Sequence, residues 1–230
     1  MSPRRSSLLI ALCGILGTVL LGLYFGIGAS IGLTQLPPGA KEAQILSVAT
    51  QYHDLWFLGT WLQATGSLLS VIFFLALVHQ AKGTTRLAGV LTLLGSAVLL
   101  AVVLIEGVFT IDLAQAATDG HQATSITSFD VMTVFTHIYP IAPAPLIFLA
   151  LGTILLGAQI LPRTFAYLAL ALGSVFEVVG VVGLFTVPAI TLIPLLLQAV
   201  WVVAAAIALL VQSRTAAELA TVQPQEQAPV

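Results

Sequence analysis

The sequence predicts an all-α integral membrane protein that crosses the bilayer six times. Hydrophobic residues make up 59% of its 230 residues and charged residues only 7%, a composition far from that of soluble domains. Six apolar runs are each long enough to cross a hydrocarbon layer of about 30 Å as a helix. We expect a polytopic six-helix bundle that forms one domain, residues 1–212. The predicted helices are residues 8–33, 54–80, 87–111, 129–160, 165–187 and 191–212.

The first apolar run follows a short basic stretch, an arrangement that a secretory signal peptide also has. Its apolar part is longer than a typical signal-peptide core and long enough to span, so we predict a retained helix and a mature protein that begins at or near Met1. Two glycine pairs, Gly22/Gly26 and Gly28/Gly32, have a spacing that lets helix backbones approach closely. We therefore expect a packing face here, which could also dock a partner subunit or a second copy.

The basic residues predict the orientation of the bundle. With six helices, all but one of the seven Lys and Arg residues fall on one side of the membrane. These are Arg4, Arg5, Lys82, Arg86, Arg163 and Arg214, with Lys41 on the other side. By the positive-inside rule, both termini are cytoplasmic, and we predict the cytoplasmic (inner) membrane of a bacterium as the location. The polar residues 213–230 would then form a disordered cytoplasmic tail.

The fourth predicted helix carries both polar residues and helix breakers. It begins near Asp130, contains His137, and then has Pro140, Pro143 and Pro145 within six residues. Proline removes a backbone hydrogen bond and clashes with the carbonyl four residues earlier, so we predict a kink. Inside hydrocarbon the freed carbonyls are tolerated only where protein or a water-filled cavity provides partners. This segment is therefore a candidate binding site.

Polar side chains recur at similar depths in the outer half of the predicted helices. At a rise of about 1.5 Å per residue, Glu106 lies about 8 Å below its helix end and Glu177 about 15 Å below, near the midplane. Each polar residue lies on a helical stripe of small or polar residues, so we infer a polar cavity that opens to the non-cytoplasmic side. The ligand-binding candidates are His137, Glu106, Glu177, Gln63, Gln198, Trp201 and Asp130.

The two glutamates are the most informative candidates. A charged residue at a helix centre in hydrocarbon costs about 2.5–3.5 kcal/mol, and the spans contain no lysine or arginine to offset it. We expect Glu177 to be protonated, and Glu106 either to pair with His137 or to face water. Two interpretations stay open: carboxyl groups that bind a ligand or handle protons, and neutral carboxyl groups that only bridge helices.

The sequence argues against several classes of protein. No basic run could follow a phosphate backbone, so nucleic acid is not an expected partner. A retinal protein needs an intramembrane lysine, whereas Lys41 and Lys82 fall in loops. Axial haem ligation needs paired ligands, and His137 is the one histidine well inside a span. His137 and the glutamates lack an established metal-ligand spacing, so we predict neither a cofactor nor a metal site.

These observations favour a protein that binds or permeates a small molecule or a lipid-like ligand, with membrane lipids around it. Two other functions fit the sequence. One is an enzyme acting on a lipid or isoprenoid, with a buried glutamate as general acid. The other is a structural membrane subunit that binds its partner through the glycine-rich first helix.

Overall fold

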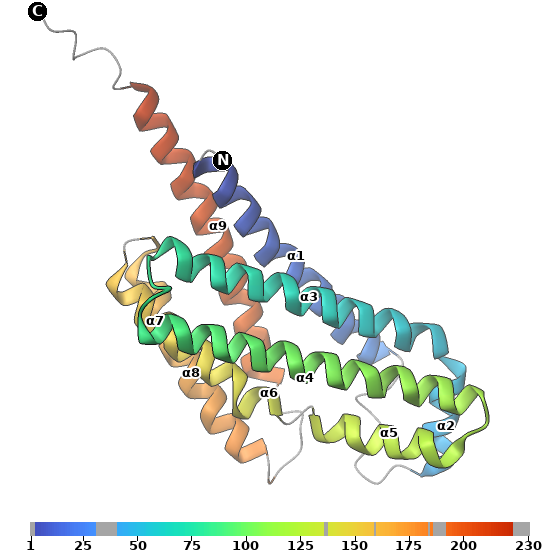
Figure 1. Ribbon diagram of the computed structural model, residues 1–230. Coiled ribbons are helices and arrows are strands. Elements are labelled where there is room, and N and C mark those ends of the chain that lie inside the picture. Colours follow the sequence, from blue (N-terminus) through green and yellow to red (C-terminus); the bar gives the residue numbers. More distant parts are fainter. Residues whose placement is uncertain are drawn as a thin grey trace, which may run out of the picture.

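The computed structural model describes residues 3–30, 41–135, 138–158, 160–183, 185 and 192–222, and these contain helices and turns but no strand, as Figure 1 shows. The all-α prediction is therefore confirmed for the described chain. Its helices are α1 (Pro3–Ser30), α2 (Glu42–Gln51), α3 (His53–Gln80), α4 (Leu87–Thr118), α5 (Gln122–Phe135), α6 (Ile138–Ile141), α7 (Pro143–Gly157), α8 (Arg163–Gly183) and α9 (Leu192–Val222).

Within the described residues, six helical stretches are long and apolar enough to cross a membrane, which agrees with a multi-pass membrane protein of six spans. The spans are Ser6–Ala29, His53–Gln80, Leu87–Thr118, Gln122–Gly157, Arg163–Gly183 and Leu192–Ser213. The third predicted helix is longer than expected, because α4 continues to Thr118. A short helix, α2, precedes the second span and lies between the first two predicted helices.

The spans pack as a bundle around aromatic side chains. Helix α1 lies against α3 and α9, α4 lies between α3 and α7, and α8 lies against α7 (Figure 1). Four fully buried phenylalanines, Phe73, Phe74, Phe148 and Phe176, connect α3, α7 and α8 in one core. Phe148 is central, because its ring lies 5.5 Å from that of Phe74 and 6.0 Å from that of Phe176.

The fourth span contains α5, α6 and α7, and its described residues show a break between α6 and α7. Ala142 separates α6 from α7 with φ −122° and ψ −65°, and Pro143 begins α7, where its missing N–H costs no helical bond. Helix α8 comes close to this junction, since a Cβ on Gly180 would lie only 2.7 Å from the carbonyl oxygen of Pro140. Thr136 and His137 lie outside the described residues, so the kink beside them stays a prediction.

The prediction of a disordered tail from residue 213 is wrong for its first part. Helix α9 continues to Val222, well beyond the predicted end at residue 212. The stretch from Thr215 to Ala220 reads TAAELA, and its alanines, glutamate and leucine are strong helix formers, which favours continuation of the helix. Residues 223–230 lie outside the described chain.

The glycines that allow close helix packing are not those that the sequence indicated. A Cβ on Gly17 of α1 would lie 2.9 Å from the carbonyl oxygen of Gly66 in α3, so the two backbones touch there. By contrast, Gly22, Gly26 and Gly28 have nothing within 4 Å of a Cβ position, and Gly32 lies outside the described residues. The expectation that Gly22, Gly26 and Gly28 form the intramolecular packing face is therefore wrong, because α1 crosses α3 nearer its amino-terminal half.

A second, smaller apolar cluster covers the end of the bundle where α2 and the α4–α5 turn lie. We call it the cap cluster; it joins α2, the start of α3, the end of α4 and α5. Trp56 is its largest member and is only 3% exposed, so it is not the interfacial anchor that a tryptophan at a helix entrance suggests. The buried members are Ile45, Ala49, Trp56, Leu113, Ala114 and Phe129.

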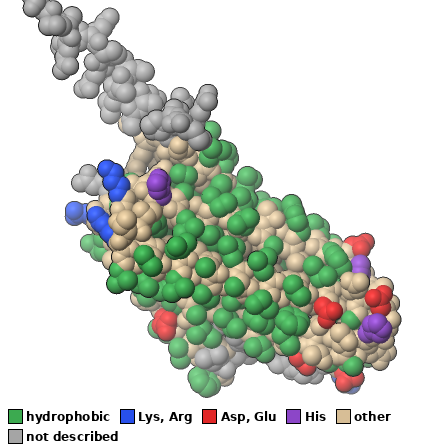
Figure 2. Space-filling model, in the orientation of Figure 1, with side chains coloured by type: hydrophobic (Ala, Val, Ile, Leu, Met, Phe, Trp, Pro, Cys, Tyr) green, Lys and Arg blue, Asp and Glu red, His purple; other side chains and the backbone are tan. Residues whose placement is uncertain are grey.

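Charges of opposite sign gather at the two ends of the molecule. Figure 2 shows Lys and Arg side chains at the end where the α3–α4 and α7–α8 turns lie, and several Asp and Glu side chains at the cap-cluster end. The exposed basic residues of the first end include Lys82, Arg86 and Arg163. This segregation has the form that the positive-inside rule requires, and a cytoplasmic location of the basic end remains our prediction.

A substitution at the α1–α3 crossing tests this packing. We expect Gly17→Val to destabilise the protein by about 1–3 kcal/mol, because its side chain would press into the Gly66 carbonyl and the Ser70 hydroxyl of α3. The measurement is thermal unfolding in detergent. Gly22→Val is the matched control, since it adds the same atoms where nothing lies within 4 Å. Equal losses in the two variants would contradict the crossing.

Candidate intramembrane polar site

A buried carboxyl group joins three helices in the bundle. Glu106 of α4 is 7% exposed, and its Oε2 accepts a hydrogen bond of 2.9 Å from Nε2 of Gln63 in α3, which is equally buried. The Tyr24 hydroxyl of α1 donates to Oε1 of Glu106 at 3.5 Å, the outer limit for a hydrogen bond. We call these three residues the Glu106 cluster. Two of its members, Glu106 and Gln63, were candidates from the sequence, and the structure brings them together.

Small residues on the neighbouring helices make room for the Glu106 cluster. Gly107 follows Glu106, and a Cβ there would lie 2.9 Å from the methyl group of Thr60, so α3 and α4 approach closely beside the carboxyl group. Gly59 of α3 similarly lies next to the Tyr24 ring, at 3.6 Å from a Cβ position. The local glycines thus let side chains from three helices converge on one point.

The electrostatic setting of Glu106 is unusual because no cation accompanies it. Within the described residues, the one ion pair within 4 Å joins His53 and Asp54, at the surface. A buried charge without a counter-charge is costly in an apolar medium, so the neutral carboxylic acid is the less costly form at this position. The predicted pairing of Glu106 with His137 is not tested, since His137 lies outside the described chain.

A second polar pair lies apart from the Glu106 cluster. The Tyr139 hydroxyl of α6 donates a hydrogen bond to Oε1 of Gln198 in α9, and the Gln198 side chain is buried. Trp201, one turn further along α9, donates from Nε1 to the carbonyl oxygen of Phe165 at 3.0 Å and sets its ring edge-on to Phe148. Gln198 and Trp201 therefore bind other parts of the protein, and the predicted single polar layer is divided into two sites.

Two predicted candidates point away from both polar sites. Glu177 and Asp130 are exposed on the outside of the described bundle. In α8 the buried side is formed by Gly173, Phe176 and Gly180. Successive residues of a helix are about 100° apart around its axis, so Glu177 lies about 70° from the middle of the direction that these three residues share. Its side chain is therefore on the outer surface. The expectation that Glu177 faces an internal cavity is therefore wrong.

The predicted open cavity is also not seen around the Glu106 cluster. Glu106 and Gln63 keep only 7% exposure each, so the helices close around them in this conformation. A hollow of about 350 Å³ lies instead at the basic end of the molecule. Its lining residues are Leu156, Gly157, Ala158, Leu161, Pro162, Arg163 and Gln212. A ligand could reach Glu106 only if a neighbouring helix moved.

Sequence reasoning missed the two tyrosines. Tyr24 and Tyr139 each donate to a residue that the sequence did single out, and each lies inside a predicted apolar run. The signal was available, because a tyrosine hydroxyl inside hydrocarbon needs a partner as much as a glutamine does. Trp61, by contrast, is 58% exposed and cannot line an internal site.

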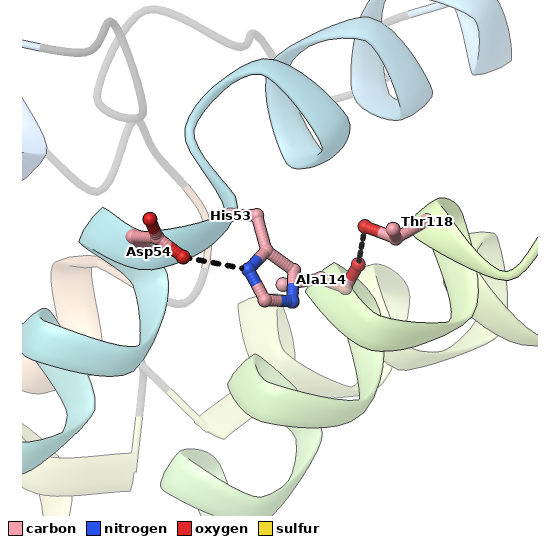
Figure 3. A network of polar contacts seen from close by, with 4 residues as sticks. All are labelled: His53, Asp54, Ala114 and Thr118. Carbon is pink, nitrogen blue, oxygen red and sulfur yellow. Dashed lines mark hydrogen bonds and ion pairs between the residues drawn. The ribbon is translucent and has the colours of Figure 1, made fainter.

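Polar groups at the cap-cluster end are mainly structural. Figure 3 shows His53 at the α2–α3 junction, with its Nδ1 3.0 Å from Asp54 Oδ1, beside the end of α4 where Thr118 bonds to the carbonyl oxygen of Ala114. The Asp54 side chain is fully exposed, so this pair adds little stability. The described residues contain no group of three His, Cys, Asp or Glu side chains placed to hold a metal ion.

Comparisons with protein-family models, with curated proteins and with solved structures return no match. The functional argument therefore rests on the chemistry of the Glu106 cluster itself.

The hydrogen bond between Gln63 and Glu106 can be tested by a double-mutant cycle. We expect Glu106→Ala to lower the free energy of unfolding by about 1–3 kcal/mol, because it leaves the buried Gln63 amide without its acceptor. Gln63→Ala should then cost much less in the Glu106→Ala background than in the wild type. Chemical unfolding in detergent measures all four proteins. Strictly additive losses would show that the two side chains do not interact.

Proposed function

We propose that this protein binds a small neutral or weakly charged molecule, or a lipid-like ligand, at the Glu106 cluster, and that transport or permeation is the purpose of the binding. The observation that carries the proposal is a carboxyl group buried between three helices, inside a span, with no cationic partner in the described chain. Ionisable groups inside membrane spans are rare and characteristically mark substrate or proton pathways.

The cluster offers a ligand both hydrogen-bond donors and acceptors. Gln63 carries two N–H donors and a carbonyl acceptor, Tyr24 a hydroxyl, and Glu106 a group that donates when neutral and accepts in either state. A ligand with a hydroxyl, amide or amine group replaces these internal bonds one for one. In such a site, loss of the Glu106 proton on ligand binding or release would couple the process to pH.

Helix α1 is the element best placed to open the cluster. Its link to Glu106 is the long 3.5 Å contact from Tyr24, whereas the Gln63 contact from α3 is 2.9 Å. Around Tyr24, Gly22 and Gly26 have no neighbour within 4 Å of a Cβ position, so this face of α1 points away from the rest of the described bundle. Displacement of this part of α1 would expose Glu106 and would break the contact between the Tyr24 ring and Gly59.

Native mass spectrometry of the protein released from mild detergent tests ligand binding. We expect a reproducible adduct in the wild type, and about two- to tenfold weaker binding in Glu106→Ala, because a hydrogen bond to a neutral carboxyl group contributes about 0.5–1.5 kcal/mol. Tyr139→Phe is the control, since it removes the other buried polar pair and leaves the Glu106 cluster intact. A bare-chain mass in the wild type, or an adduct kept by Glu106→Ala, would contradict the proposal.

A second function, a membrane subunit that binds a partner protein, is favoured by the exposed Glu177. This carboxyl group lies within the apolar α8 span, beside the exposed Val178 and Val181. An acid that faces lipid is costly unless another helix covers it with a donor or a cation. The open glycine face of α1 offers a further surface for such a helix.

The partner-binding alternative predicts a distinct outcome. We expect Glu177→Leu to release a co-purifying protein and to leave the adduct at the Glu106 cluster unchanged. The reason is that Glu106 is buried between helices, whereas Glu177 is exposed on the outside of α8. Gentle affinity purification followed by mass spectrometry measures both. If Glu177→Leu changes neither composition nor yield, this carboxyl group has no partner protein.

A further inference from the structure

The hollow at the basic end of the molecule lies where three spans end. Its lining residues come from the end of α7, the α7–α8 turn, the start of α8 and Gln212 of α9. The corresponding membrane spans end at Gly157, begin at Arg163 and end at Ser213. The hollow, which we call the basic-end pocket, is therefore at the depth where hydrocarbon gives way to lipid headgroups.

Two arginines border the basic-end pocket from different helices. Arg163 is one of its lining residues, at the first position of α8. Arg86, just before α4, places its Nη1 only 3.4 Å from the Cβ position of Gly157, which also lines the pocket. No carboxylate of the described chain lies within 4 Å of either guanidinium group, since the one such ion pair is between His53 and Asp54. Both arginines are thus available to an anion.

The remaining lining is suited to the rest of a lipid. Leu156 and Leu161 supply apolar walls, and Gln212 supplies a polar side chain at the rim. The two adjoining helices also carry exposed apolar side chains, Leu168 on α8 and Val211 on α9, which can contact the acyl chains of surrounding lipid. The pocket also contains the first residue of the 21-residue helix α8, whose amino-terminal dipole end favours negative charge.

We propose that the basic-end pocket binds the phosphate group of an anionic membrane lipid, held by Arg163 and Arg86. Arginine binds phosphate through parallel N–H donors, and basic pockets between spans on the cytoplasmic side are a known setting for anionic headgroups. The site is separate from the Glu106 cluster and does not depend on the function proposed for it. Its occupant would tie α4, α7, α8 and α9 together at one membrane surface.

The test compares two lipids with the same acyl chains, phosphatidylglycerol and phosphatidylcholine, added at equal concentrations to the full-length protein in detergent. Native mass spectrometry measures how much of each lipid stays bound. We expect the wild type to retain phosphatidylglycerol preferentially. Arg163→Gln and Arg86→Gln should each weaken that binding about fivefold, which corresponds to about 1 kcal/mol per basic residue near an anionic headgroup.

Lys41→Gln is the matched control, because it removes one positive charge at the opposite end of the molecule. It should leave the lipid preference unchanged, and an equal effect of Lys41→Gln and Arg163→Gln would overturn the proposal. Equal retention of the two lipids by the wild type would overturn it as well. Arg163→Lys keeps the charge and should lose less than Arg163→Gln, which separates a local phosphate contact from a folding defect.

Inorganic phosphate identifies the source of the bound group. Added alone, it should neither raise the melting temperature nor displace phosphatidylglycerol, since it lacks the acyl chains that the apolar walls accept. If inorganic phosphate alone stabilises the wild type and not Arg163→Gln, the pocket serves a soluble phosphate compound and the lipid assignment is wrong.

Discussion

The constraint on which this fold depends is the need of every polar group inside hydrocarbon for a partner within the protein. Most hydroxyl groups in the spans meet it locally. Ser70, Thr92 and Thr110 each donate to the carbonyl oxygen four residues earlier in their own helix. Such bonds need no neighbouring helix, so they leave helix packing to shape and to apolar contact. Serine and threonine in these spans therefore say little about the site.

The longer polar side chains find their hydrogen-bond partners on other helices, and these bonds determine which helices are joined. The Glu106 cluster joins α1, α3 and α4, and the bond between Tyr139 and Gln198 joins α6 to α9. Phe148 of α7 contacts Phe74 of α3, Phe176 of α8 and Trp201 of α9. The bundle thus combines an aromatic core with two separate polar contacts between helices.

The architecture could be predicted from composition because the length of an apolar run is a direct physical requirement of the bilayer. The number and approximate borders of the spans followed from that requirement. The direction in which each side chain points did not follow from it, since that direction depends on where the neighbouring helices lie.

Glu177 shares a helical stripe with Gly173 and Gly180, yet a shift of about 70° around α8 was enough to place it outside. Gly22 and Gly26 match a packing motif, but α1 crosses α3 at Gly17 instead. Spacing identified Glu106 and Gln63 as residues of similar depth, and only the three-dimensional arrangement shows that they bind each other.

The position of Glu106 in the chain has a consequence for the biogenesis of the protein. Helices are synthesised in sequence order, and both donors to Glu106, Tyr24 and Gln63, belong to spans that come before α4. When α4 leaves the translocation channel, groups that can bond to its acid have therefore already been made, and the cost of moving that acid into lipid is lowered at the time it arises. Glu177 enters later, on a helix whose outer face has no partner in the described chain. Insertion of α8 must instead depend on its apolar sequence, which at 21 residues is the shortest of the six spans in the described chain. Among the six, its membrane integration should therefore be the most sensitive to a second polar substitution.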